Sequence, residues 1–125
     1  YGLVGSEMCI RDSLTSHQVK AEAYVDKEKP LVLIGSPPCV AFSQLQSLIP
    51  DSDRKAKQLA EGTRHMEFVV ELYKKQVDGG RIFIHENPAH AKSWALPRIR
   101  RMTRQKKTLR KRKNVAAMSC YILLP

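Results

Sequence analysis

The stretch "LVLIGSPPCVAF", residues 31–42, decides the fold that the sequence predicts. It opens with four apolar residues, and two prolines and a cysteine follow a Gly-Ser pair. A short apolar run of this kind is typical of a strand that is buried on both faces of a parallel sheet. The prolines fix the backbone φ, so they hold Cys39 at low entropic cost just beyond the carboxyl end of that strand.

A long helix and a second strand are predicted further along the chain. The segment "RIFIHE", residues 81–86, predicts another buried strand, and the Gly79-Gly80 pair before it is a helix stop signal. Strand, helix and strand make a βαβ unit with parallel strands, whose carboxyl ends meet at one edge of a sheet. The apolar residues at helical spacing between the two strands are Met66, Val69, Val70, Tyr73 and Val77.

The remaining segments before residue 81 give weaker patterns. Residues 15–28 predict a helix, and residues 43–49 predict a short one. Residues 51–63 are polar, and we expect them to be mobile up to Thr63, which can cap the long helix. The apolar side chains that share one face of the first helix are Val19, Ala23 and Tyr24.

The chain is long enough for one domain, and its charge is distributed unevenly. Its 125 residues carry a net charge of +10, yet every acidic residue lies before Asn87. Ten of the sixteen residues in 98–113 are Lys or Arg, a run that favours binding to phosphates, although a solvated tail would have the same composition. We expect a helical or disordered basic tail over 98–125. The candidate nucleic-acid-binding residues are Arg98, Arg100, Arg101, Arg104, Lys106 and Lys107.

Cysteine usage and hydropathy bear on the compartment. The three cysteines are odd in number and form no CxxC pair, which argues for a reducing environment. No apolar run is long enough for a membrane span. We therefore expect an intracellular protein, nuclear if the source is eukaryotic. Residues 1–13 have the character of an artefactual segment, residues 14–97 of a partial catalytic core, and residues 98–125 of a truncated tail.

Cys39 and Glu86 are the two candidate catalytic residues, because Cys39 follows one predicted parallel strand and Glu86 ends the other. A thiolate is a strong nucleophile, and a carboxyl group at the end of an apolar strand can share a proton near neutral pH. Taken singly, Cys39 is also compatible with an inert structural role, and Glu86 with a turn cap or an ion pair to Arg81. No metal site is expected, because the spacing of the histidines and Cys39 matches no zinc motif.

Two motifs in matching order carry a resemblance. "GSPPCVAFS", residues 35–43, resembles the catalytic Pro-Cys motif of DNA cytosine-5 methyltransferases, and "FIHENP", residues 83–88, resembles that family's Glu-Asn-Val motif. The resemblance implies a Rossmann-like α/β catalytic core and DNA as the partner. It also implies that Cys39 attacks C6 of a flipped-out cytosine, that Glu86 protonates N3, and that S-adenosylmethionine supplies a methyl group to C5.

The resemblance covers about residues 29–97. The family's F-x-G-x-G cofactor loop is not found, so we expect most of the S-adenosylmethionine-binding segment to be missing and the isolated chain to be inactive, with little or no turnover. The similar "SPPY" loop of amino-methylating DNA methyltransferases fits less well, because that class does not call for a Glu-Asn pair. An alternative is a catalytically inactive nucleic-acid-binding fragment of a mobile-element polyprotein. Residues that match the family's substrate-binding framework are Pro37, Pro38, Phe42, Ser43 and Asn87.

Overall fold

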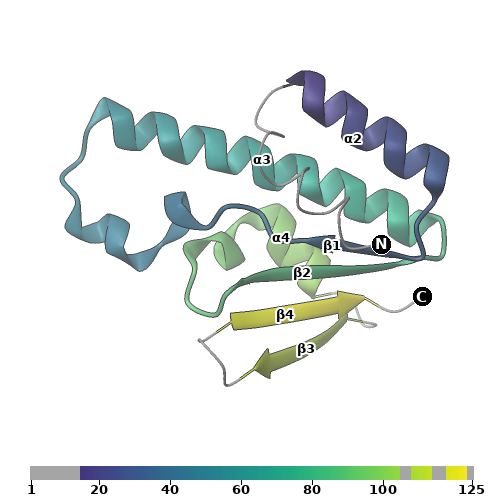
Figure 1. Ribbon diagram of the computed structural model, residues 1–125. Coiled ribbons are helices and arrows are strands. Elements are labelled where there is room, and N and C mark those ends of the chain that lie inside the picture. Colours follow the sequence, from purple (N-terminus) through teal and green to yellow (C-terminus); the bar gives the residue numbers. More distant parts are fainter. Residues whose placement is uncertain (1–14, 105–107, 114–117, 124–125) are drawn as a thin grey trace.

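A four-stranded sheet is covered on one face by a long helix, against which the other two α-helices described pack (Figure 1). The computed structural model describes residues 15–104, 108–113 and 118–123, and the side chains of residues 16–104. The strand order is β1-β2-β4-β3, and the bounds are Val32–Gly35 for β1, Ile82–Pro88 for β2, Thr108–Lys113 for β3 and Met118–Leu123 for β4. The predicted α/β fold class is confirmed.

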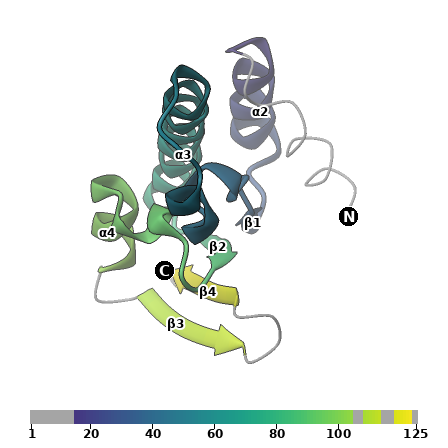
Figure 2. The ribbon, with the colours of Figure 1, turned by 90° about the vertical axis from the view of Figure 1, so that its left-hand side faces the viewer.

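The βαβ unit is present, with α3 as the connection. β1 pairs with β2 in parallel, from Val32 opposite Ile82 to Gly35 opposite His85. Between them α3, Asp53–Asp78, runs above the sheet, and Figure 2 shows it end-on over β1 and β2. The buried core lies between α3 and the sheet, where Met66, Val70 and Tyr73 pack with Phe83 of β2.

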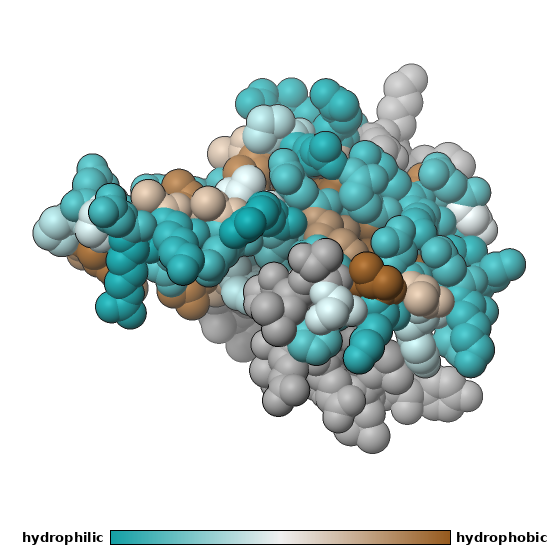
Figure 3. All heavy atoms as spheres, turned by 90° about the horizontal axis from the view of Figure 1, so that it is seen from above, coloured by the Kyte–Doolittle hydropathy of each residue, from teal (hydrophilic) through white to brown (hydrophobic). Residues whose placement is uncertain are grey.

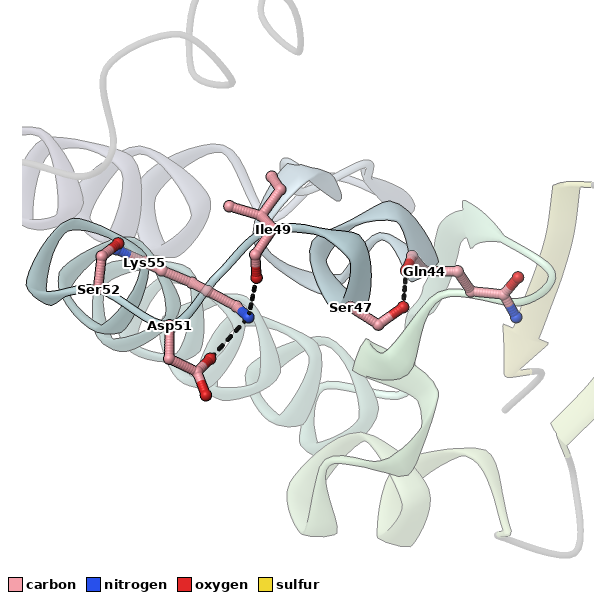
Figure 4. A network of polar contacts seen from close by, with 6 residues as sticks. All are labelled: Gln44, Ser47, Ile49, Asp51, Ser52 and Lys55. Atoms are coloured by element: carbon pink, nitrogen blue, oxygen red, sulfur yellow. Dashed lines mark hydrogen bonds and ion pairs between the residues drawn. The ribbon is translucent and has the colours of Figure 1, made fainter.

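The prediction for the start of this helix was wrong. Residues from Asp53 onward are helical, and Ser52 is the cap because its Oγ accepts the Lys55 N–H at 3.3 Å. Thr63 lies inside the helix, where its hydroxyl donates to the Leu59 carbonyl. Lys55 also donates to Asp51 and to the Ile49 carbonyl, so the first turn is fastened to the preceding chain (Figure 4). The first half of α3 is polar and has little apolar surface to bury. The hydrogen bonds of Ser52 and Lys55 to nearby residues therefore help to stabilise it.

The first half of α3 and the turn before it project beyond the ends of the strands (Figure 1). That turn is the 3-10 helix η2, Gln44–Leu48, where the sequence predicted a short helix over 43–49. Viewed from the helical side, the surface is mainly hydrophilic, with apolar atoms showing at the projecting end and between the helices (Figure 3). The exposed apolar residues of the projection are Leu45, Leu48, Ile49 and Leu59.

The first helix has the predicted bounds, but a different face is buried. α2 spans Thr15–Glu28 and packs on α3. Its buried residues are Ala21 and Val25, whereas Val19 is 60% exposed and Tyr24 41% exposed. Ion pairs from Lys75 of α3 to Glu22 and Asp26 accompany this contact. The apolar residues of α2 are too few to define a face by pattern alone, so the packing partner decided which side turned inward.

β1 is an edge strand, which corrects the prediction that it would be buried on both faces. Val32 is 41% exposed and Ile34 58% exposed, while their neighbour Leu33 packs against the core. β2 shows the same alternation, because Phe83, His85 and Asn87 are buried and the residues between them only half-buried. The apolar run therefore marks a strand with one face covered, and within the described residues no helix covers the other face.

The basic tail, expected to be helical or disordered, is helical at its start but continues into two strands. α4, Pro97–Thr103, packs on α3 and buries Ile99 and Met102. β3 and β4 then form an antiparallel pair, and β4 pairs antiparallel with β2. A strand pairs there because the edge of β2 opposite β1 has backbone N–H and C=O groups that need hydrogen-bond partners. None of the helices described is both long and apolar enough to cross a membrane.

Candidate functional site

The carboxyl ends of β1 and β2 lie side by side, as the sequence predicted. Gly35 is opposite His85 in the parallel register, so Ser36 and Glu86 follow at the same edge of the sheet. The Ser36 hydroxyl donates a hydrogen bond to Glu86 Oε2 at 3.2 Å, which connects positions that are fifty residues apart. The loop that carries Cys39 therefore starts in direct contact with the Glu86 carboxylate.

Cys39 is held in a tight turn just beyond that contact. It precedes the 3-10 helix η1, Val40–Phe42, and its carbonyl accepts the Phe42 N–H at 2.9 Å. The thiol is free and half-buried, so the residue is neither sealed in the core nor fully exposed. Pro37 is buried and Pro38 is exposed. Together the prolines and the turn restrict the backbone on both sides of the thiol.

Tyr73 of α3 contacts the ends of both parallel strands through its hydroxyl. Its hydroxyl lies 2.8 Å from His85 Nδ1 and donates to the Gly35 carbonyl at 3.3 Å. A Cβ at Gly35 would come within 1.9 Å of that hydroxyl, so glycine is required at this close approach. The sequence pattern placed Tyr73 on the apolar face of the helix and missed this polar role. A tyrosine within a buried stripe is a signal for it, since buried hydroxyls need partners.

His85 and Trp94 pack against each other, and the His85 side chain points to the opposite side of β2 from Glu86. Burial lowers the pKa of the His85 imidazole to about 4, so the ring is neutral near pH 7. Its plane stands at 89° to the Trp94 ring, with the ring centroids 5.0 Å apart. Trp94 belongs to the 3-10 helix η3, Lys92–Ala95, and its indole N–H donates to the Pro88 carbonyl at 2.7 Å. These contacts fold the chain after β2 back over the end of that strand.

The predicted substrate-binding residues have varied positions. Phe42 is 2% exposed and belongs to the core cluster, while Ser43 caps η2 by accepting the Leu45 N–H at 3.2 Å. Asn87 is 1% exposed and points to the opposite side of β2 from Glu86. Only Pro38 among these residues is exposed. Phe42 therefore packs in the core and Ser43 caps a helix, so these two residues have structural contacts in addition to the predicted role.

The predicted nucleic-acid-binding residues separate into two groups. Arg98 pairs with Glu71 and, at 4.0 Å, with Glu67, both on α3. Arg100, Arg101 and Arg104 are exposed, and none of the acidic residues described pairs with them. Lys106 and Lys107 lie outside the described residues.

A site for S-adenosylmethionine does not emerge from the residues described. Gly35, at the end of β1, has no side chain, but the Tyr73 ring occupies the space beside it, so no ligand can bind there. The described histidines, cysteine and acids also form no group of three that could hold a metal ion. Comparison with protein-family models, with curated proteins and with solved structures returned no match.

Proposed function

We propose that the edge formed by β1 and β2 carries out the chemistry of a DNA cytosine-5 methyltransferase. The observation that supports this most is the hydrogen bond between Ser36 and Glu86, because it brings the Cys39 loop and the carboxylate to one rim. A thiol and a carboxyl group at one rim can act on opposite sides of a pyrimidine ring. A base must leave the stack to reach them, so a flipped cytosine is the proposed substrate.

In the proposed reaction the Cys39 thiolate forms a bond to C6 of cytosine. The electron pair of the C5–C6 double bond shifts to make a C4–C5 double bond, the pair of the C4–N3 double bond moves to N3, and N3 takes a proton from Glu86, which offsets the developing charge. C5 is then a carbon nucleophile. Loss of the C5 proton and departure of the thiolate restore the aromatic ring after C5 has reacted.

S-adenosylmethionine is the proposed methyl donor, and it would supply the methyl group that C5 receives. We assign it no residues, because the glycine-rich loop of the family is not among those described. The Cys39 and Glu86 steps can be tested without it. Addition at C6 followed by protonation at C5 exchanges the C5 hydrogen with solvent and consumes neither a methyl donor nor an oxidant.

The test is incorporation of deuterium at C5 of cytosine in single-stranded and duplex oligonucleotides, measured by mass spectrometry in D₂O. We expect exchange with the wild-type chain, none with Cys39→Ser, and a rate at least about 100-fold lower with Glu86→Gln. Cys9→Ser serves as the matched thiol control and should exchange normally. Exchange that persists in a folded Cys39→Ser variant, or a folded wild-type chain that gives none, contradicts the proposal.

A second candidate function is nucleic-acid binding without catalysis. The observation that favours it is the exposure of Arg100 and Arg101 on α4 and of Arg104 directly after it, together with the surplus of basic residues that follows them. Three guanidinium groups without acidic partners on and beside one short helix suit contacts to a phosphate backbone. This function would survive the loss of Cys39 and Glu86.

The test compares two variants in a salt titration of oligonucleotide affinity. Replacing Arg100, Arg101 and Arg104 together by Gln should weaken binding and flatten the dependence of log K on log salt by about 0.7–0.9 per arginine that contacts phosphate. Arg98→Gln is the control, since Glu71 already neutralises that side chain, and should change the slope little. Equal slopes for the triple variant and the wild type would exclude this surface.

A further inference from the structure

The polar side-chain atoms that are buried without a hydrogen-bond partner come from one short stretch of the chain. Among the described residues they are His85 Nε2, both amide atoms of Asn87 and the hydroxyl of Ser93. All four atoms come from a nine-residue stretch, although polar residues are spread along the whole chain. Buried polar groups in folded proteins are almost always paired with protein or with ordered water. The concentration of four in one stretch therefore indicates a shared partner.

The local fold brings these three residues together. His85 and Asn87 lie on the same side of β2, about 7 Å apart along the strand, because side chains alternate. Ser93 belongs to η3, and the ring of the next residue, Trp94, stands against His85. The Trp94 indole also bonds to the Pro88 carbonyl, so η3 is held over the end of β2. We call His85, Asn87 and Ser93 the buried polar cluster.

The chemistry of the cluster restricts what can pair with it. Asn87 offers donors and acceptors, Ser93 offers a hydroxyl that does both, and His85 offers one ring nitrogen because Tyr73 engages the other. The partner must therefore both donate and accept. It must also be small, since the three residues are at most 1% exposed. Water satisfies both conditions, and one buried molecule ordinarily makes about three hydrogen bonds.

We infer that the buried polar cluster binds ordered water between β2 and η3. The water links the strand that carries Glu86 to the turn that covers it, on the side of β2 away from Glu86. This inference concerns the interior of the fold and does not depend on the proposed function.

Ser93→Ala tests the inference by the sign of its effect on thermal stability, since the two side chains have nearly the same volume. If Ser93 bonds to water, removing the hydroxyl breaks that bond and should lower the Tm by about 3–6 °C. If the hydroxyl has no partner, its replacement by a methyl hydrogen removes a buried unsatisfied group, and the Tm should stay constant or rise. The latter outcome would overturn the inference. Ser16→Ala, at an exposed serine of α2, is the control for serine replacement itself.

A direct readout complements the melting experiment. Magnetisation transfer from water to the Asn87 side-chain amide protons should give the signal of a long-lived water in the wild-type chain, and a weaker one in Ser93→Ala. The exposed amide of Gln44 supplies the reference for surface water. A wild-type Asn87 amide without any such transfer would also overturn the inference.

Discussion

At the scale of single residues, the burial of His85 changes the pKa of its imidazole. Its ring is 1% exposed and contacts Tyr73 at one nitrogen, and it has no acid at hydrogen-bonding distance among the described residues. Burial disfavours the charged imidazolium, which lowers the pKa to about 4 from the usual 6.5. The unfolded chain therefore binds a proton on this residue more readily than the folded chain between those two values.

This difference predicts an acid-sensitive stability. The contribution of neutral His85 is fully present above about pH 6.5 and is lost as the pH falls towards 4, by about 3 kcal/mol across that window. Urea unfolding at a series of pH values measures it. His85→Gln should remove this part of the pH dependence, whereas His90→Gln, at an exposed histidine, should keep it. A His85→Gln profile that parallels the wild type would contradict the argument.

At the scale of elements, Tyr73 determines how α3 sits on the two parallel strands. Its ring stacks on Phe83 with centroids 4.2 Å apart, and its hydroxyl reaches the Gly35 carbonyl at the end of β1. The absence of a side chain at Gly35 makes this approach possible, because a Cβ there would lie 1.9 Å from the hydroxyl and 2.8 Å from ring carbon Cζ. This one contact therefore fixes how α3 lies against the end of β1, from which the Cys39 loop starts.

Gly35→Ala tests this contact. The added methyl group forces Tyr73 or β1 to move, and we expect a loss of about 3 kcal/mol or more in the free energy of unfolding, measured in urea. Tyr73→Phe alone should lose about 1–3 kcal/mol, because it leaves His85 Nδ1 without its tyrosine partner. In the double variant the losses should be less than additive, since the nearest clashing atom is gone. Strict additivity would show that the two sites do not interact.

At the scale of the whole molecule, the core occupies one side of the sheet. Phe83 is 1% exposed beneath α3, while Ile34 on the neighbouring strand is 58% exposed on the other face. Both residues belong to apolar runs that look alike in the sequence. Their contributions to stability should differ sharply, because only one of them leaves water on folding.

The paired substitutions Phe83→Ala and Ile34→Ala measure this asymmetry. We expect the first to lower the free energy of unfolding by about 3–5 kcal/mol and the second by no more than about 1 kcal/mol. Chemical denaturation of both variants under the same conditions gives the comparison. Similar losses at the two positions would mean that the outer face is covered in solution.

Local sequence signals determined the elements whose causes are local. The helix over residues 15–28, the stop at Gly79 and the parallel pairing of two apolar strands were all predictable, because turn residues and short apolar runs act over a few positions. The juxtaposition of the Cys39 loop with Glu86 followed from the same pairing. The start of α3 was not predictable from apolar periodicity, since a serine cap and lysine contacts decide it.

Tertiary structure alone decided which faces are buried and where the last strands lie. The pattern of β1 could not distinguish an edge strand from a central one, because that depends on which strand pairs beside it. The face of α2 that turned inward and the role of Tyr73 likewise depend on partners remote in the chain. Sequence pattern determines what a segment can form, whereas burial is a property of the assembled layers and is settled only when they pack.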